Sequence, residues 1–126
     1  MARFSQMAVA SGLNAVASAG LDMSKEDSFR VGVVLGNGNG GFPTIEENCR
    51  ILVSRGGMRM SPFFFPMILP NMASANVSHF TGARGYNSTA STACAASNQA
   101  FGEALGIIRH GMADAVLAGG AEAGIS

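Results

Sequence analysis

The spacing of apolar residues along the chain divides it into predicted helices and strands. In residues 3–19 most apolar side chains recur three or four positions apart, which predicts an amphipathic helix with Gly20 at its C-terminal cap. Further helices are predicted at residues 43–54, at residues 70–79, and from Cys94 to the capping Gly111. The chain is therefore expected to begin on a helix.

Strands are predicted where the apolar period disappears. Residues 31–35 and 115–118 are continuous apolar runs, which are typical of strands buried on both faces of a parallel sheet. Residues 87–91 are β-prone, so residues 87–119 read as one strand–helix–strand unit. The pattern indicates an α/β fold class with helices packed on a mostly parallel sheet.

The predicted helix after Cys94 carries a stripe of small and apolar residues. The glycines at positions 102 and 106 are expected to let this helix approach the sheet closely. The stripe comprises Ala96, Ala100, Ala104, Leu105 and Ile108.

Between the second and third helices the apolar residues lose their period. Residues 58–72 are rich in Met, Phe and Pro, and their pattern indicates an apolar loop. This loop could lie in the core, at a subunit interface or against a membrane. Core or interface is favoured because prolines interrupt the segment and no basic cluster flanks it. The run around Pro66 is also too short for a membrane span, which needs about 20 apolar residues.

Composition narrows the function classes. A chain of 126 residues with 48% hydrophobic and 13% charged residues suits a single domain that buries much of itself. Eight basic and eight acidic side chains balance, so neither nucleic acid nor an anionic membrane is an expected partner. Two distant cysteines and no secretory signal pattern indicate a cytoplasmic location.

Cys94 is the candidate nucleophile. A side chain at a strand-to-helix turn projects at the rim of a sheet, where the free N–H groups of the new helix point toward whatever binds the side chain. The positive end of the helix dipole favours thiolate over thiol. A buried packing role is the plainer interpretation of a lone cysteine among small residues. Cys49, inside a predicted helix, is interpreted as structural or half-exposed.

The glycine-rich segment after the first strand has two readings. Gly36-Asn-Gly-Asn-Gly-Gly41 invites a phosphate-binding interpretation, yet it lacks the lysine of a P-loop and fits the dinucleotide fingerprint only loosely. A tight turn at a strand end is favoured.

Taken together, these segments closely resemble the elongating β-ketoacyl-acyl-carrier-protein synthases. The similarity covers essentially the whole chain and corresponds to an inner part of the N-terminal half of a two-half, thiolase-like fold. It therefore implies a single partial domain over residues 1–126. The matching segments are Gly36–Gly41, Ile45-Glu-Glu-Asn48, Ser61-Pro-Phe-Phe64, Pro70-Asn-Met72, Ser91-Thr-Ala-Cys94-Ala-Ala-Ser97 and Gly111–Ala123.

The resemblance implies a chemistry for Cys94. Its thiolate takes an acyl group from acyl carrier protein or coenzyme A, and its own N–H is one oxyanion-hole donor. Malonyl-acyl carrier protein then loses carbon dioxide and the resulting carbanion attacks the acyl thioester, which lengthens the chain by two carbons in fatty acid biosynthesis. No cofactor and no metal are expected, because a thioester already activates the acyl carbon.

The same resemblance suggests two substrate-binding residues. Asn39 stands where the family commonly has an apolar residue of the acyl pocket, which predicts a shifted or shorter acyl preference. Phe64 is expected near a homodimer interface and the partner's acyl channel. Glu122 follows a buried strand and is given no catalytic role. The family's catalytic histidines match neither His79 nor His110, so we expect this chain alone not to condense.

Alternatives remain open at this stage. A polyketide-type ketosynthase is one, although Ser91 replaces the Asp common in modular enzymes. A non-catalytic partner subunit typically lacks the cysteine, a thiolase shares the fold and a cysteine at the same turn, and a cysteine hydrolase would need a histidine base near Cys94.

Overall fold

A computed structural model describes residues 1–125, and its centre is a parallel sheet of three strands. The strands are β1 (Val31–Gly36), β2 (Asn87–Ala90) and β3 (Ala115–Gly120), in the order β2-β1-β3. Val33 of β1 lies opposite Asn87 of β2 and Leu117 of β3. The first strand in the sequence is therefore the central one, and the connection from β2 to β3 passes over it.

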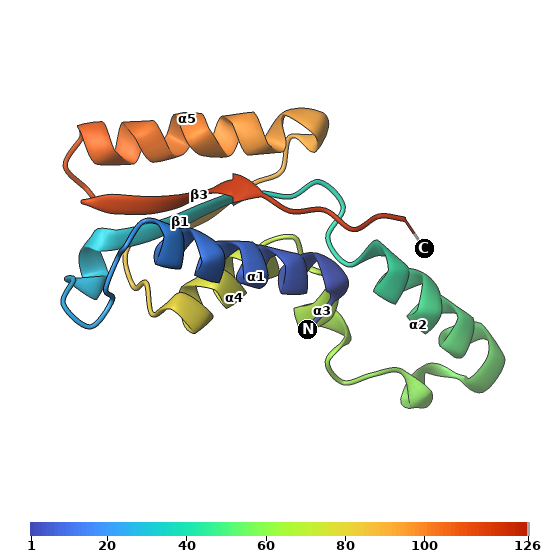
Figure 1. Cartoon of the computed structure of the whole chain (residues 1–126). Coiled ribbons are helices and arrows are strands. Elements are labelled where there is room, and N and C mark those ends of the chain that lie inside the picture. The colour runs from blue at the N-terminus through green and yellow to red at the C-terminus, as the bar shows by residue number, and fades with distance from the viewer. Residues whose placement is uncertain (126) are drawn as a thin grey trace.

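Helices cover both faces of this sheet (Figure 1). Helices α1 (Arg3–Ser18) and α4 (Met72–Thr81) pack against each other on one face, and α5 (Ala96–Arg109) lies on the other. Helices α2 (Phe42–Arg55) and α3 (Phe64–Ile68) lie to one side, past the carboxyl ends of the strands. The result is a three-layer α/β arrangement.

The central strand β1 is buried on both faces of the sheet. Every residue of β1 is buried, since side chains of alternate positions enter cores on opposite faces. Val33 joins Phe4 of α1 and Val77 of α4 in the larger cluster. On the other face Val34 packs with residues of α5 and the turn before β3, among them Ala100, Ile107 and Ala113.

The predicted fold class and most predicted elements are confirmed. The strands and the helices α1, α4 and α5 begin and end within two residues of their predicted limits. Helix α2 begins at Phe42, just before the predicted start, and ends at Arg55. Helix α3 was not predicted, because Pro66 and three adjacent phenylalanines obscure any period in that segment.

Two expectations for α5 are wrong. Its buried stripe is Ala96, Ala100, Ala104 and Ile107, whereas Leu105 and Ile108 are 49% and 45% exposed. No atom lies within 4 Å of a side-chain carbon placed at Gly102 or Gly106, so these glycines provide no close approach to the sheet. The small side chains of the buried alanines instead allow α5 to pack closely on the strands.

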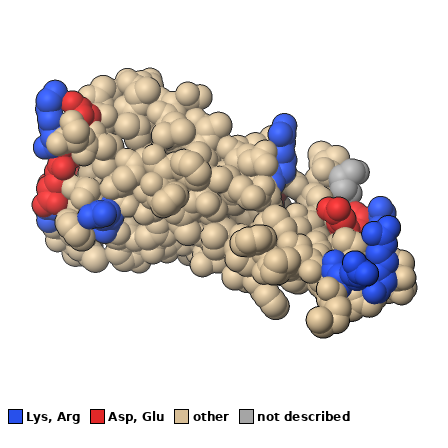
Figure 2. Space-filling model, turned by 90° about the horizontal axis from the view of Figure 1, so that it is seen from below, with Lys and Arg blue, Asp and Glu red and all other residues tan. Residues whose placement is uncertain are grey.

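The apolar loop after α2 is largely at the surface. Met58, Phe63 and Phe65 are 99%, 68% and 65% exposed, so a core role is wrong for these three. No helix within residues 1–125 combines the length and hydropathy that crossing a bilayer needs. On the α1/α4 side, charged side chains gather at the two ends and leave an uncharged middle (Figure 2).

Candidate active site

Cys94 lies in the turn between β2 and α5, as predicted. A single turn of 3-10 helix, Ala93–Ala95, follows the end of β2 and leads directly into α5. Cys94 is exposed in this turn. The residue before it, Ala93, has φ +50° and is the only non-glycine residue with positive φ in the described part of the chain. Such a conformation costs an L-residue about 1–2 kcal/mol and persists only when its surroundings enforce it.

Two glycines let this turn sit directly on the strand ends. A side-chain carbon at Gly36, the last residue of β1, would overlap backbone atoms of Ala96 and Ser97 at the start of α5. A side-chain carbon at Gly120, the last residue of β3, would overlap the Ser97 hydroxyl. Glycine at both strand ends therefore brings the first turn of α5 against the carboxyl edge of the sheet.

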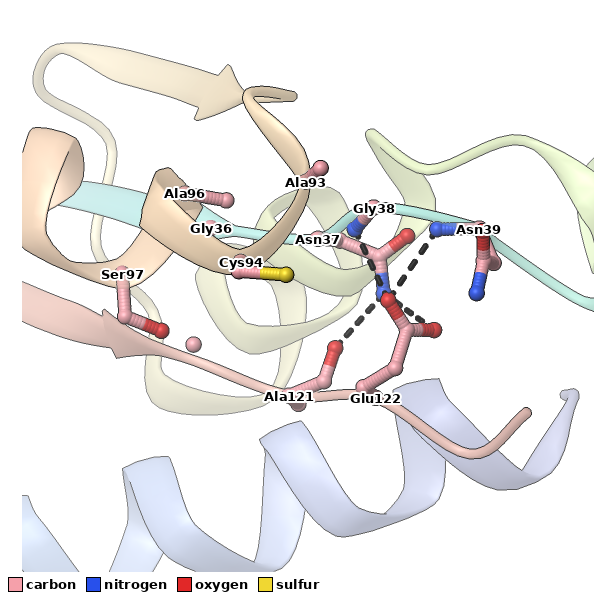
Figure 3. Close-up of a pocket in the computed structure, with 11 residues that line it drawn as sticks. Gly36, Asn37, Gly38, Asn39, Ala93, Cys94, Ala96, Ser97, Ala121 and Glu122 are labelled. Carbon is pink, nitrogen blue, oxygen red and sulfur yellow. Dashed lines mark hydrogen bonds between the residues drawn. The ribbon is translucent and has the colours of Figure 1, made fainter. Parts of the chain in front are cut away.

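A pocket of about 530 Å³ opens beside the turn (Figure 3). Its walls come from the ends of β1 and β3, the loops that follow them, and the turn that carries Cys94. The Cys94 sulfur points toward the side of the pocket where Asn37 and Glu122 lie. The residues that line the pocket are Gly36, Asn37, Gly38, Asn39, Ala93, Cys94, Ala96, Ser97, Gly120, Ala121 and Glu122.

A hydrogen-bond network holds the wall opposite Cys94. The buried Asn37 donates from Nδ2 to the Ala121 carbonyl at 2.6 Å and accepts at Oδ1 from the Gly40 N–H at 2.6 Å. Glu122 accepts at Oε2 from the N–H groups of Gly38 and Asn39, at 2.8 and 3.0 Å. The glycine-rich loop thus bends after β1 and is tied to the segment after β3 by these hydrogen bonds.

The structure brings some predicted residues together and separates others. Asn39 is exposed and lines the same pocket as Cys94. Phe64 is half-buried at the start of α3, stacks edge-on against Phe65 at 5.4 Å between ring centroids, and does not line this pocket. Its expected role toward a partner subunit stays a prediction. Asn37 was missed, although its place between glycines after a buried strand could have identified it.

The remaining candidate chemistry lies elsewhere. His79 and His110 are exposed and do not line the pocket, so neither is a base for Cys94. Cys49 is exposed on α2 and does not line the pocket. Within residues 1–125 no three His, Cys, Asp or Glu side chains are grouped to bind a metal ion.

Comparison with solved structures defines the class of fold. The chain superposes with a TM-score of 0.92 on a type II polyketide ketosynthase solved in complex with its acyl carrier protein and bound to the hexaketide, at 30% identity over 98% of this chain and 35% of that one. A β-ketoacyl synthase from Burkholderia phymatum gives a TM-score of 0.82 at 30% identity, over 94% of this chain and 29% of that one. The fold is thiolase-like.

The family follows from sequence comparison. The model of the β-ketoacyl synthase N-terminal domain matches residues 1–126, and the chain belongs to this family. It is 43% identical over its full length to 3-oxoacyl-[acyl-carrier-protein] synthase 2 of Staphylococcus aureus, and 40% identical over 119 residues to the protein of the same name from Vibrio cholerae. It spans 31% and 29% of the length of these two relatives.

Proposed function

We propose that this chain carries the acyl-accepting cysteine of a 3-oxoacyl-acyl-carrier-protein synthase of fatty acid biosynthesis. The observation that carries the proposal is that Cys94, exposed in the turn before α5, opens into a pocket of about 530 Å³. The relatives named above as 3-oxoacyl-[acyl-carrier-protein] synthase 2 support the choice of reaction.

The turn provides what acyl transfer needs. The Cys94 thiolate attacks the carbonyl carbon of an acyl thioester, and the electron pair of the C=O bond moves to oxygen. N–H groups in the first turn of a helix have no partner within the helix, so we expect the N–H of Cys94 to bind this oxyanion. The oxyanion then collapses, the C–S bond to the carrier breaks, and the carrier thiolate leaves and takes up a proton.

Condensation follows on the acylated cysteine. Malonyl-acyl carrier protein loses carbon dioxide, its carbanion attacks the acyl carbon, and the Cys94 thiolate leaves with the electron pair of the broken C–S bond. No histidine lines the Cys94 pocket, so residues 1–126, proposed as one partial domain, are expected to accept an acyl group without condensing it.

The proposed setting is a cytoplasmic homodimer that receives its thioesters from acyl carrier protein. The solved complex of a structural neighbour with its acyl carrier protein supports that partner.

Acylation of Cys94 tests the proposal directly. The chain is incubated with acyl-acyl carrier protein, and intact mass and peptide mapping locate any added acyl group. We expect one acyl group on Cys94, none in Cys94→Ala, and unchanged acylation in Cys49→Ala, since Cys49 is an exposed cysteine away from the pocket. Equal acylation of the two cysteines, or none at Cys94, would overturn the assignment.

A type II polyketide ketosynthase is the second candidate. It is favoured by the hexaketide-bound neighbour, and by a ketosynthase/chain length factor structure with a TM-score of 0.88 at 29% identity. The two candidates differ in the acyl group that they accept. Faster acylation by saturated acyl thioesters than by β-ketoacyl thioesters supports fatty acid synthesis, and the reverse order supports polyketide synthesis.

A further inference from the structure

The carboxylate of Glu122 binds the backbone rather than a charged side chain. Its Oε2 accepts from two consecutive N–H groups, those of Gly38 and Asn39, and Oε1 lies 3.4 Å from Asn37 Nδ2. Two successive amide groups that converge on one oxygen form an anion-binding concavity, and hydrogen bonds to a charged acceptor are the stronger kind. Glu122 therefore fixes the conformation of the loop after β1.

That loop lies directly against the turn of the nucleophile. A side-chain carbon placed at Gly38 would lie 3.2 Å from Glu122 Oε2 and 3.5 Å from the Ala93 α-carbon. A methyl group at Gly38 would thus touch both the carboxylate and Ala93, the residue with φ +50° that precedes Cys94, so the loop and the turn are close neighbours. We expect a loop held this close to Ala93 to help to keep that residue in its unfavourable backbone conformation.

We propose that Glu122 is a positioning residue for Cys94, acting through the loop at Gly38. The carboxylate holds the loop, the loop restrains Ala93, and the restrained turn presents the Cys94 sulfur to the pocket. This inference rests on the proposed function for its biological meaning, since a positioned thiolate matters most to an acyl-accepting enzyme. It assigns Glu122 no contact with the reacting atoms.

Two substitutions separate geometry from charge. Glu122→Gln keeps the chain length and one oxygen acceptor for the two N–H groups but removes the charge. Glu122→Asp keeps the charge but withdraws the oxygens by one methylene. If Glu122 positions the loop, Glu122→Gln should keep Cys94 reactive and Glu122→Asp should not. If only its negative charge matters, Glu122→Asp should match the native chain and Glu122→Gln should not.

Alkylation by iodoacetamide provides the readout in the 126-residue chain. Peptide mapping follows Cys94 and Cys49 in one reaction, so Cys49 on α2 is an internal control. We expect the Cys94-to-Cys49 rate ratio to fall about tenfold in Glu122→Asp and to stay within about twofold in Glu122→Gln, because the loss of hydrogen bonds to a charged acceptor has an effect of that order. Hydrogen exchange at the Gly38 and Asn39 amides should accelerate in Glu122→Asp alone.

The controls are Glu47→Gln and Glu47→Asp, because Glu47 is exposed on α2 and does not line the pocket. They should leave the rate ratio unchanged. An unchanged ratio in both Glu122 variants, or a larger loss in Glu122→Gln than in Glu122→Asp, overturns the inference. The proposed function is tested separately, since failure of Cys94 to accept an acyl group in the native chain leaves the ordering of these alkylation ratios intact.

Discussion

The α-carbon of Gly36, at the end of β1, lies directly against the backbone of Ala96, in the first turn of α5. No space remains there for even a methyl group. The contact sets how closely the start of α5 approaches the central strand. Since Cys94 lies two residues before Ala96, it also sets where the sulfur stands at the sheet edge.

Gly36→Ala should therefore displace the turn that carries Cys94. We expect a loss of about 1–3 kcal/mol in the free energy of unfolding, which is typical of overpacking against rigid backbone, together with slower alkylation of Cys94. Urea denaturation measures the first effect and iodoacetamide kinetics the second.

Gly102→Ala is the matched control for Gly36→Ala. A side-chain carbon at Gly102 meets nothing within 4 Å, so alanine there should stabilise α5 by about 0.5–1 kcal/mol and leave Cys94 reactivity unchanged. Equal responses at positions 36 and 102 would show that the close contact at the strand end has no consequence.

A second prediction concerns the backbone of Ala93. Its φ of +50° disfavours any side chain, whereas Ala95, two residues later, has an ordinary φ of −89°. Glycine relieves the strain at position 93 but only adds unfolded-state entropy at position 95. Ala93→Gly should thus be more stable than Ala95→Gly by about 1–2 kcal/mol in urea unfolding. If the two variants unfold at the same urea concentration, Ala93 is not strained.

Much of this fold could be predicted from local sequence. The apolar run at the centre of β1 predicts a strand buried on both faces, and the change of period around Cys94 predicts a strand-to-helix turn. Both features depend on residues adjacent in the chain. The position of Cys94 in a strand-to-helix turn could therefore be predicted without any tertiary contact.

The wall opposite Cys94 could not be predicted in the same way. Asn37 and Glu122 are separated by 85 positions, and no local period links a glycine-rich loop to the segment after β3. Their contact exists because β1 and β3 pair in parallel and place their carboxyl ends side by side. The unexpected role of Gly36 has the same origin, since only the sheet register reveals which backbone it faces.

Acid should weaken the fold in part through Asp114. Arg30 donates to its carboxylate from Nε at 2.7 Å and from Nη2 at 2.6 Å, and this pairing lowers the pKa of Asp114 below its usual value. Because the folded-state pKa is the lower one, the pair stabilises the fold above about pH 4 and the contribution is lost as the pH falls through the folded-state pKa.

Asp114→Asn should remove that part of the acid dependence. The urea midpoint of the variant is expected to lie below that of the native chain at neutral pH and to converge with it as the pH falls through the folded-state pKa of Asp114. Glu47→Gln, at a carboxylate outside the three observed ion pairs of residues 1–125, should keep the native pH profile. Parallel profiles for Asp114→Asn and the native chain would contradict the expected linkage.

The last prediction concerns acyl preference and Asn39. An amide at the pocket wall that an acyl chain must cover without a hydrogen-bond partner costs about 1–3 kcal/mol, and the cost applies only to acyl chains long enough to reach it. Asn39→Ile should therefore speed acylation of Cys94 by long-chain thioesters while leaving acylation by short-chain thioesters nearly unaffected.

The loop should keep its conformation in this variant, because the Asn39 N–H that binds Glu122 is a backbone group and is retained after the substitution. Rates of acylation are compared across a series of acyl-acyl carrier proteins, with Asn14→Ile, at an exposed position of α1 away from this pocket, as the matched control. Identical chain-length profiles for Asn39→Ile and the native chain would show that Asn39 does not limit the acyl group.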